Sequence, residues 1–246
     1  MPKLIILNRI VVITLILLCL IAPAQSAIIY VSPSGDDIND GSSWALAKKT
    51  LSRNDTNPVV KGALTAAVSG DEIWVAAGTY VERITLKDGV VLYGGFTGTE
   101  TTREQRNPKR NISILDGNQA GSVVTAGAGV SNSTIIDGFT IQNGKATYGG
   151  GINLNNCAVQ IKNNRIINNS TTSSGGGGGV YITNCSTNIP SLSENLIAFN
   201  TALSGAGIYI NSSSPNLIGN TISDNISSSG NGGGVYCISN SSPTIQ

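Results

Sequence analysis

The chain contains no histidine, and charged residues make up only 12% of its 246 residues. With no imidazole and few carboxylates, the composition offers little material for acid–base catalysis and favours a non-catalytic role. The 15 Lys and Arg residues nearly balance the 14 Asp and Glu residues, which argues against nucleic acid or an anionic membrane as the main partner. Charge is scarcest beyond Gly117, where the acidic residues are Asp137, Glu194 and Asp224 and the basic residues are Lys145, Lys162 and Arg165.

The N-terminal residues have the pattern of a secretory signal peptide. A basic start leads into an apolar run at residues 10–22 that is too short to cross a bilayer, and Ala22-Pro23-Ala24 fits a cleavage site. An uncleaved anchor is the alternative. We predict a protein that is secreted, extracellular or on the outer cell surface, with a signal peptide at residues 1–27. The mature domain, residues 28–246, is expected to have no membrane span.

Four glycine blocks divide the second half of the chain into repeats. Their nearly constant spacing is typical of a solenoid, in which each unit buries its apolar face by stacking on its neighbours. Apolar and polar residues alternate after each block, which indicates β-strands with one face inward. The blocks are Gly149-Gly150-Gly151-Ile152, Gly177-Gly178-Gly179-Val180, Gly205-Ala206-Gly207-Ile208 and Gly232-Gly233-Gly234-Val235.

A second pattern, of asparagine and apolar residues, recurs between the glycine blocks. Its apolar positions predict two core stacks, and its asparagines predict two ladders in which the amides of successive coils hydrogen-bond to one another. The stacks are Ile166, Ile197 and Ile222, and Ile161, Leu192, Leu217 and Ile245; the ladders are Asn164, Asn195 and Asn220, and Asn169, Asn200 and Asn225. Parallel, in-register stacking makes the predicted fold an all-β parallel β-helix, a single-stranded solenoid.

These repeats resemble those of a known superfamily. Gly-Gly-Gly-Val-Tyr followed by Asn-x-Ile-x-x-Asn is similar to the right-handed parallel β-helix proteins of the pectin-lyase-like superfamily, above all secreted bacterial members and polymorphic outer-membrane-protein repeats. The opening Tyr30-Val31-Ser32-Pro33-Ser34-Gly35 and the segment Tyr93-Gly94-Gly95-Phe96 are similar as well. The resemblance implies right-handed coiling. It implies little about activity, because such solenoids serve as enzymes, adhesins and surface scaffolds.

The region before the repeats is predicted to begin the solenoid. Residues 58–68 place apolar side chains on one helical face, and a short N-terminal capping helix of this kind commonly covers the open edge of a first coil. At about 25 residues per coil, residues 71–246 make about seven coils of one domain. The segments just before the glycine blocks, such as residues 170–176, are predicted to be short loops. The chain stops inside a repeat, which is typical of a fragment of a longer protein, and we expect a monomer.

Cysteine is scarce, and Cys157, Cys185 and Cys237 remain after the leader. Cys157 and Cys185 occupy equivalent places in consecutive repeats, so a disulfide between them is one interpretation, although in-register stacking gives poor geometry for the bond. We expect three free thiols, with Cys237 as a small buried hydrophobic residue.

No set of residues has the pattern of a catalytic or metal site. Lyases of the superfamily generally combine calcium-binding carboxylates with an Arg or Lys base, and hydrolases on the fold use sets of carboxylates; neither set recurs at one repeat position. Residues 36–41 lack the calcium-loop pattern and are predicted to be a turn. The basic cluster is interpreted as a solvated loop. We expect no catalytic residue, no metal and no cofactor. The basic cluster comprises Arg103, Arg106, Lys109 and Arg110.

One row of outward-facing residues is a candidate binding site. The position two residues after each third glycine is, in successive repeats, Asn153, Tyr181, Tyr209 and Tyr236. Its apolar neighbours point inward, so this position faces solvent, and in-register coils stack it at a spacing of about 4.8 Å. An aromatic strip with polar tips suits a polysaccharide or cell-surface glycan. A purely structural stack is the alternative.

Two functions follow from these patterns. Short loops, few charges and the lack of histidine favour a secreted or cell-surface, non-catalytic β-helix scaffold of adhesin type that contacts glycans. The alternative is a polysaccharide lyase or glycoside hydrolase that acts on acidic polysaccharide, with catalytic residues in the early coils or outside this chain.

Overall fold

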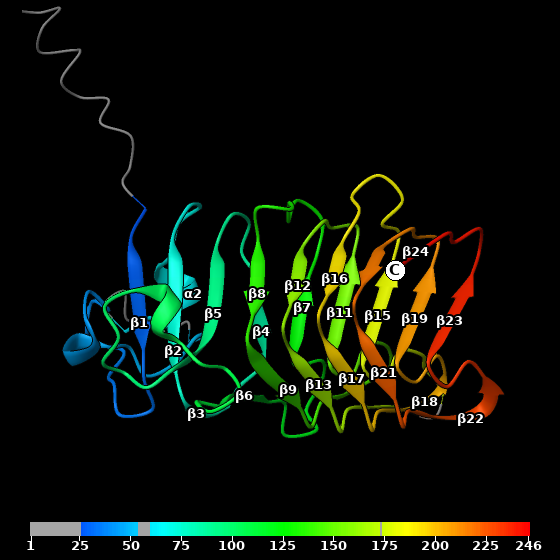
Figure 1. Cartoon of the computed structure of the whole chain (residues 1–246), viewed down its shortest axis with the longest axis horizontal. Coiled ribbons are helices and arrows are strands. Elements are labelled where there is room, and N and C mark those ends of the chain that lie inside the picture. The colour runs from blue at the N-terminus through cyan, green and yellow to red at the C-terminus, as the bar shows by residue number, and fades with distance from the viewer. Residues whose placement is uncertain (1–25, 54–59, 173) are drawn as a thin grey trace, which may run out of the picture.

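The computed structural model describes residues 26–53, 60–172 and 174–246, which form a parallel β-solenoid (Figure 1). Equivalent strands of successive coils pair in parallel and build four sheets, named here A to D in the order in which the chain visits them. The predicted signal peptide at residues 1–27 lies almost wholly outside the described residues. Within them, no helix is long and apolar enough to cross a membrane.

The four sheets differ in length. Sheet A contains β1 (Ile28–Val31), β2 (Glu72–Ala76), β5 (Val91–Phe96), β8 (Ile135–Asp137), β12 (Gln160–Lys162), β16 (Ser191–Ser193), β20 (Asn216–Ile218) and β24 (Thr244–Ile245). Sheet B contains β3 (Gly78–Val81), β6 (Ser113–Asp116), β9 (Phe139–Gln142), β13 (Arg165–Ile167), β17 (Leu196–Ala198) and β21 (Thr221–Ser223). Sheet C contains β10 (Lys145–Ala146), β14 (Ser170–Thr171), β18 (Thr201–Ser204) and β22 (Ile226–Asn231). Sheet D contains β4 (Ile84–Thr85), β7 (Val124–Ala126), β11 (Ile152–Asn155), β15 (Val180–Thr183), β19 (Ile208–Asn211) and β23 (Val235–Ile238).

The described solenoid makes about five full turns, fewer than the seven predicted. Sheets B and D each contain six strands, and six stacked strands span about five turns. The prediction assumed one repeat length for the whole chain. The early coils differ in length, because Glu72 pairs with Val91 across residues 73–90 alone, whereas Val91 pairs with Ile135 across an insert that contains the 3-10 turn η2 (Arg103–Gln105).

The capping helix predicted over residues 58–68 is not supported. Among the described residues the only α-helix is the single turn α2 (Ala63–Ala66), and Pro58 lies outside them. Ala63 and Leu64 are buried, but Gly62 at the N-cap has no side chain that could accept from the first turn. A four-residue segment makes too few hydrogen bonds to form a stable helix by itself. A second short turn, η1 (Trp44–Leu46), precedes it.

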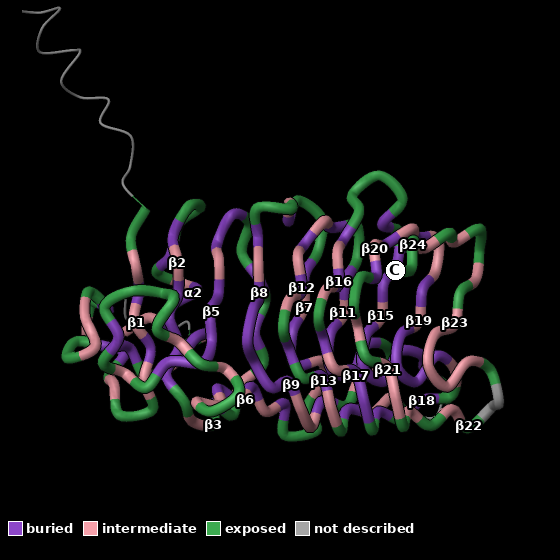
Figure 2. Tube along the Cα trace, in the orientation of Figure 1, coloured by how far each residue is buried: buried purple, intermediate pink, exposed green. Residues whose placement is uncertain are grey.

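A continuous core runs along the inside of the solenoid, and Figure 2 shows buried residues recurring from coil to coil. The two predicted stacks are confirmed by the strand register. Ile161 pairs with Leu192, Leu192 with Leu217, Leu217 with Ile245, Ile166 with Ile197, and Ile197 with Ile222. Ile245 nevertheless remains 66% exposed, because no further strand of the described chain covers it.

Two asparagine ladders tie the coils of the repeats together, as predicted. In each ladder, the side-chain oxygen of one asparagine accepts from the backbone N–H of the asparagine one coil earlier. Asn200, for example, accepts from the N–H of Asn169 at 3.0 Å and donates through Nδ2 to the carbonyl of Ile166 at 2.9 Å. The ladders therefore satisfy buried backbone groups at the two corners that flank sheet B, where no strand partner is present. They comprise Asn164, Asn195 and Asn220, and Asn169, Asn200 and Asn225.

The residue before each ladder asparagine has a left-handed backbone, with φ between 53° and 62°. Asparagine, aspartate and glycine tolerate this conformation, whereas longer and aromatic side chains adopt it rarely. Glu194 and Phe199 are therefore unusual occupants of these corners. The six corner residues are Asn163, Asn168, Glu194, Phe199, Gly219 and Asp224.

The glycine blocks allow the coils to approach closely. At Gly179, an added Cβ would lie 2.6 Å from the carbonyl oxygen of Gly207 and 3.0 Å from Cγ2 of Ile197, so a side chain would push the coils apart. The segments before the blocks were predicted to be loops but pair as sheet C, with Ser170 opposite Thr201. Small side chains let these backbones run side by side.

Cysteine and serine form a third ladder at the corner between sheets D and A. The N–H of Cys157 donates to Sγ of Cys185 at 3.4 Å, and the N–H of Cys185 donates to Oγ of Ser213 at 2.9 Å. All three predicted free thiols are free, and Cys157 and Cys185 are buried. The hydrogen bond between the thiols raises the pKa of Cys157 and lowers that of Cys185. Cys237 was predicted to be buried but is exposed, because it lies on the outermost strand of sheet D.

Candidate functional site

The structure places Tyr181, Tyr209 and Tyr236 in one row on the outward face of sheet D. They occupy paired positions on β15, β19 and β23, between residues that point into the core. The ring centroids of Tyr181 and Tyr209 are 5.4 Å apart, and those of Tyr209 and Tyr236 are 5.3 Å apart. Asn153 occupies the same position one coil earlier, on β11. All four candidate residues therefore lie together.

A fourth tyrosine, Tyr148, extends the row and was missed by the sequence analysis. Its ring centroid lies 4.8 Å from that of Tyr181, and Nδ2 of Asn153 donates to its carbonyl oxygen at 3.5 Å. Tyr148 comes from the turn before β11, so strand periodicity did not point to it. The available signal was its place directly before a glycine block, where the next two repeats have Gly176 and Ser204. We call Tyr148, Tyr181, Tyr209 and Tyr236 the tyrosine row.

The rings of the tyrosine row pack against one another. Their planes meet at 34° for Tyr148 and Tyr181, 38° for Tyr181 and Tyr209, and 68° for Tyr209 and Tyr236. Neighbouring rings therefore contact one another at tilted or edge-on angles and do not form a face-to-face stack. Burial, followed by the neighbouring tyrosines, raises the pKa of Tyr209. Within the described part of the chain, none of the four hydroxyls has a hydrogen-bond partner.

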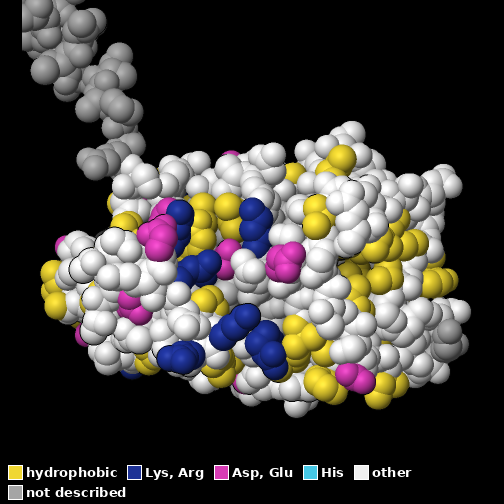
Figure 3. Space-filling model, in the orientation of Figure 1, with side chains coloured by type: hydrophobic (Ala, Val, Ile, Leu, Met, Phe, Trp, Pro, Cys, Tyr) yellow, Lys and Arg dark blue, Asp and Glu magenta, His cyan; other side chains and the backbone are white. Residues whose placement is uncertain are grey.

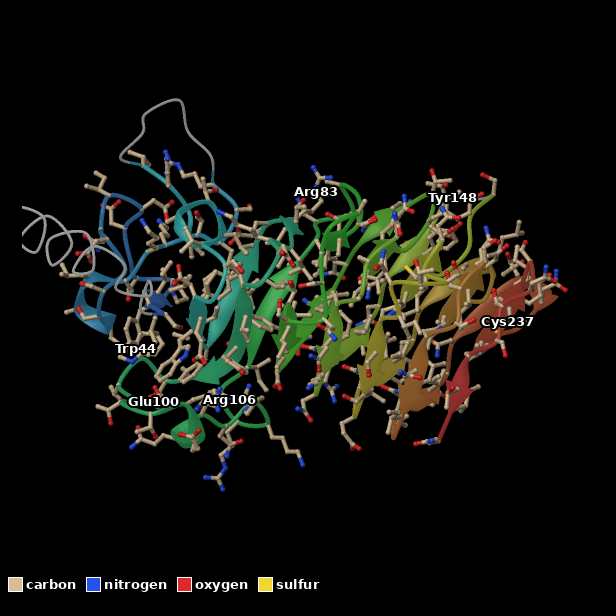
Figure 4. All side chains as sticks on the ribbon, turned by 90° about the horizontal axis from the view of Figure 1, so that it is seen from above. Trp44, Arg83, Glu100, Arg106, Tyr148 and Cys237 are labelled. Carbon is tan, nitrogen blue, oxygen red and sulfur yellow. The ribbon has the colours of Figure 1, made fainter. Side chains whose placement is uncertain are left out.

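Toward the earlier coils, the same face of sheet D is polar. Thr125 pairs with Asn153, and Thr85 pairs with Thr125 so that their Oγ1 atoms are 3.0 Å apart. A hollow of about 580 Å³ lies there and is lined by both threonines and by Arg83. Figure 4 shows Arg83 and Tyr148 along the same side of the solenoid. Sheet D thus offers a continuous surface that is polar at one end and aromatic at the other.

A second concave surface lies where sheet A meets sheet B, and we call it the charged groove. Its volume is about 840 Å³. Figure 3 shows charged side chains gathered over β5, β8 and β12, whereas the same face is nearly uncharged over the later coils. Arg106, which lines the groove, lies on the opposite side of the solenoid from Tyr148 (Figure 4). The charged lining residues are Arg103, Arg106, Lys109 and Arg165, with Glu104, Asp137 and Glu194.

Ion pairs hold two of the groove's arginines, in contrast to the solvated loop predicted from the sequence. Arg106 Nη2 lies 2.7 Å from Oδ1 of Asp137, and Arg103 Nη1 lies 3.2 Å from Oε1 of Glu72. Both guanidinium groups also lie over the ring of Tyr93, at 5.1 Å for Arg103 and 4.9 Å for Arg106, within the range of a cation–π interaction. The sequence did not predict this arrangement because its members lie on different coils.

Both carboxylate oxygens of Asp137 bind neighbouring side chains. It is 6% exposed, and its second oxygen accepts from Nδ2 of Asn163 at 3.1 Å. A buried carboxylate with both oxygens engaged orients its partners. Its role is therefore to fix Arg106 and Asn163 at the groove.

Comparison with known protein families identifies the family of this chain. The profile of the family described as "Protein of unknown function (DUF1565)" matches residues 34–240. The chain belongs to this family. No curated protein and no solved structure matches the chain. The family match and the solenoid together fit a β-helix repeat protein, and both the tyrosine row and the charged groove of this DUF1565 protein lie within the matched residues.

The acidic segment at residues 36–41 of the DUF1565 protein has a structural role. Asp37 is 1% exposed, and its Oδ1 accepts from the backbone N–H groups of Lys49 and Thr50 at 3.0 and 2.9 Å. Across the described ranges, no three residues of the His, Cys, Asp and Glu types gather in a way that could hold a metal ion. The carboxylate of Asp37 therefore anchors a loop of the first coil.

Proposed function

We propose that this protein is an exported, non-catalytic β-solenoid that contacts a glycan through the tyrosine row. The observation that carries the proposal is a line of four stacked tyrosines whose hydroxyls have no partner among the described residues. Tyrosine combines an apolar ring with a polar tip, which suits a surface that is both apolar and hydrogen-bonding. An extended sugar chain presents both kinds of group.

The packing of the rings defines the expected mode of contact. Neighbouring rings contact one another at tilted angles, so we expect the sugar to meet ring edges and hydroxyls, and Asn153, Thr125 and Thr85 would extend the contact toward the earlier coils. Because successive coils are about 4.8 Å apart, a chain lying along the row would contact several coils at once. We infer a linear glycan as the ligand.

The wider proposal also rests on the sequence. The pattern of residues 1–27 supports export to the cell surface or the medium, where glycans are accessible. The resemblance to the right-handed β-helix proteins of the pectin-lyase-like superfamily supports a scaffold or adhesin-like role. A monomer would leave sheet D open to the ligand.

The experiment is a glycan array with the purified mature protein and two variants. The triple variant Tyr181→Phe, Tyr209→Phe and Tyr236→Phe keeps the stacked rings and removes the hydroxyls; the matching triple Ala variant removes both. We expect the Phe variant to fold normally and lose about tenfold or more in affinity, because hydrogen bonds through several hydroxyls are lost. A folded Ala variant that binds every positive glycan as tightly as the wild type would show that the row is structural.

A lyase or hydrolase acting on acidic polysaccharide is the second candidate, and the charged groove is the observation in its favour. Lys109 and Arg165 could act as bases there, and Glu194 as an acid or base, since all three line the same hollow. The engagement of Asp137 weakens this candidate. We expect no unsaturated product from polygalacturonate, alginate or chondroitin. Absorbance of unsaturated uronides that disappears with Arg165→Gln would establish the enzyme instead.

A further inference from the structure

The charged groove contains three charged side chains that the structure does not use. Arg106 is paired with Asp137, and Arg103 is paired with Glu72 and, at 3.5 Å, with Glu104. Lys109, Arg165 and Glu194 also line the groove, yet among the described residues none of them forms an ion pair or a side-chain hydrogen bond. The groove thus offers two unpaired cations and one unpaired carboxylate.

The scarce charges of the repeats converge on this groove. Beyond Gly117 the sequence has three acidic and three basic residues, and Asp137, Arg165 and Glu194 line the groove. Elsewhere the repeats carry few charges, and their exposed side chains include apolar ones such as Phe199 and Ile226. The charges of the repeats are therefore unevenly distributed, and the groove brings residues of both signs together.

The backbone of Glu194 is a second, independent observation. Glu194 has a φ of 56°, at the corner position that is Asn163 in the preceding coil and Gly219 in the next. Asparagine and glycine suit this left-handed conformation, and glutamate does so poorly. The same conformation recurs at the other corners, including Phe199 with a φ of 57°, so it fixes where the Glu194 side chain starts and does not by itself mark a site. The strained corner holds a carboxylate at the rim of the groove.

We propose that the charged groove binds a small zwitterion of the amino-acid type, with a carboxylate, an ammonium group and an aliphatic body. Arg165 and Lys109 receive the carboxylate, since a guanidinium can bind it through two hydrogen bonds. Glu194 receives the ammonium group, and Ile112 and Leu196, which also line the groove, contact the aliphatic body.

A sugar is a poorer fit to the groove than an aliphatic zwitterion. The nearby aromatic ring of Tyr93 is 9% exposed, and the guanidinium groups of Arg103 and Arg106 lie against it. No open ring face is therefore offered for a sugar to pack on. Because the groove and the tyrosine row lie on opposite sides of the solenoid, this proposal stands apart from the proposed glycan contact.

The first test is calorimetric titration of the mature protein with three probes: leucine, N-acetyl-leucine, which lacks the ammonium group, and leucine amide, which lacks the carboxylate. We expect leucine to bind in the millimolar range and each altered probe to bind about fivefold more weakly, as expected for partly exposed ion pairs. Absence of leucine binding up to about 10 mM, or equal binding of all three probes, would overturn the proposal.

Single substitutions then test which side chain binds the ammonium group of leucine and which binds its carboxylate. Glu194→Gln should abolish the preference for leucine over N-acetyl-leucine and leave the preference over leucine amide intact. Arg165→Gln should do the reverse. The matched controls are Asp224→Asn and Lys145→Gln, which change the two exposed charges of the repeats that lie away from the groove, and both should bind all probes as the wild type does.

Two further outcomes decide between this site and a general charge effect. If the controls weaken leucine binding as much as the groove variants, the effect reflects net charge and the proposed site is wrong.

Glu194→Asn should raise the melting temperature, because the corner strain is relieved, while it removes the ammonium preference. The triple Phe variant of the tyrosine row should bind leucine normally, so that failure of the glycan proposal is distinguishable from failure of this one.

Discussion

The first coils and the later repeats build the same sheets with different chemistry. In the first coils, carboxylates accept from the backbone of irregular loops: the partly buried Glu82 accepts from the N–H groups of Leu51 and Ser52, and the buried Glu100 accepts from those of Thr97, Gly98 and Thr99. In the repeats, neutral asparagine amides satisfy the corners. Each region therefore pairs its buried backbone groups, one with charges and the other without.

The spacing of the coils explains this difference. Identical side chains in an in-register solenoid stand about 4.8 Å apart. A ladder of carboxylates at that distance would repel itself, and each member would become harder to ionise. An amide is both donor and acceptor, so an asparagine such as Asn200 can accept from the N–H of Asn169 in the preceding coil and donate to a carbonyl of that coil and to the amide oxygen of Asn225 in the next. Carboxylates are therefore suited to a loop that occurs once, and amides to a corner that recurs.

The largest loss of stability is expected from a substitution in the core of the repeats. Ile197 has no exposed surface and pairs with Ile166 and Ile222. Ile197→Asp buries an unpaired charge between coils and should lower the free energy of unfolding by about 4 kcal/mol or more. Ile197→Val is the control and should cost about 1 kcal/mol. Chemical denaturation measures both, and wild-type stability of Ile197→Asp would contradict the register.

Loss of one ladder amide is the next largest effect. Asn200→Ala leaves the N–H of Asn169 and the carbonyl of Ile166 without their buried partners. We expect a loss of about 2 to 3 kcal/mol in the free energy of unfolding. Asn132→Ala removes an exposed amide outside the ladders and should change the stability by less than about 0.5 kcal/mol. Equal effects of the two substitutions would mean that the ladders do not support the repeats.

Acid should destabilise the first coils more than the repeats. Burial by itself would raise the pKa of Glu100, but hydrogen bonds from the backbone of Thr97 and Thr99 and from the Thr97 hydroxyl outweigh it, and the pKa lies below its ordinary value. A carboxyl whose pKa is lower in the folded state stabilises the fold above its unfolded pKa, and that contribution is lost as the pH falls through the folded pKa. The loop at residues 97–112 should therefore open in acid while the asparagine ladders remain closed.

Hydrogen exchange, corrected for the intrinsic effect of pH, measures this separation. Protection of residues 97–112 should fall below about pH 4, whereas protection of the corners at Asn169 and Asn200 should not change. In Glu100→Gln the loop should be less protected at neutral pH and should lose its acid dependence. A parallel loss of protection in the repeats would contradict the assignment of acid sensitivity to the first coils.

The smallest change in stability is expected at Phe199, a corner residue that departs from the repeat pattern. Phe199 has a φ of 57° and is 56% exposed, whereas the equivalent corner one coil later is Asp224 with a φ of 55°. Phe199→Asn should raise the free energy of unfolding by about 0.5 to 1 kcal/mol, because asparagine tolerates the left-handed backbone. Asp224→Asn is the control and should be neutral. Destabilisation by Phe199→Asn would show that the exposed ring makes contacts that outweigh the strain.

The sequence predicted most where a pattern recurs. Period-two alternation and a constant repeat identified the core stacks, the asparagine ladders and the positions of Tyr181, Tyr209 and Tyr236, because stacking repeats one local geometry. It failed where the chain is irregular: residues 58–68 form only one helical turn among those described, and the number of turns is smaller than expected. The sequence analysis missed Tyr148, because this residue lies in a turn and strand periodicity does not apply to it, although its ring contacts that of Tyr181.

The sequence by itself determined the parallel solenoid, since only stacking can bury the apolar face of each repeat. Only the tertiary structure decided which charged residues, far apart in the sequence, lie close together in the groove. Asp137, Arg165 and Glu194 lie on successive coils, far apart in the chain, and the inserted loop with Arg103 and Arg106 folds back against them. Pairings of this kind depend on where an irregular insert packs, which no period in the sequence encodes. The groove is therefore a property of the folded molecule, and the tyrosine row is a property of the repeat.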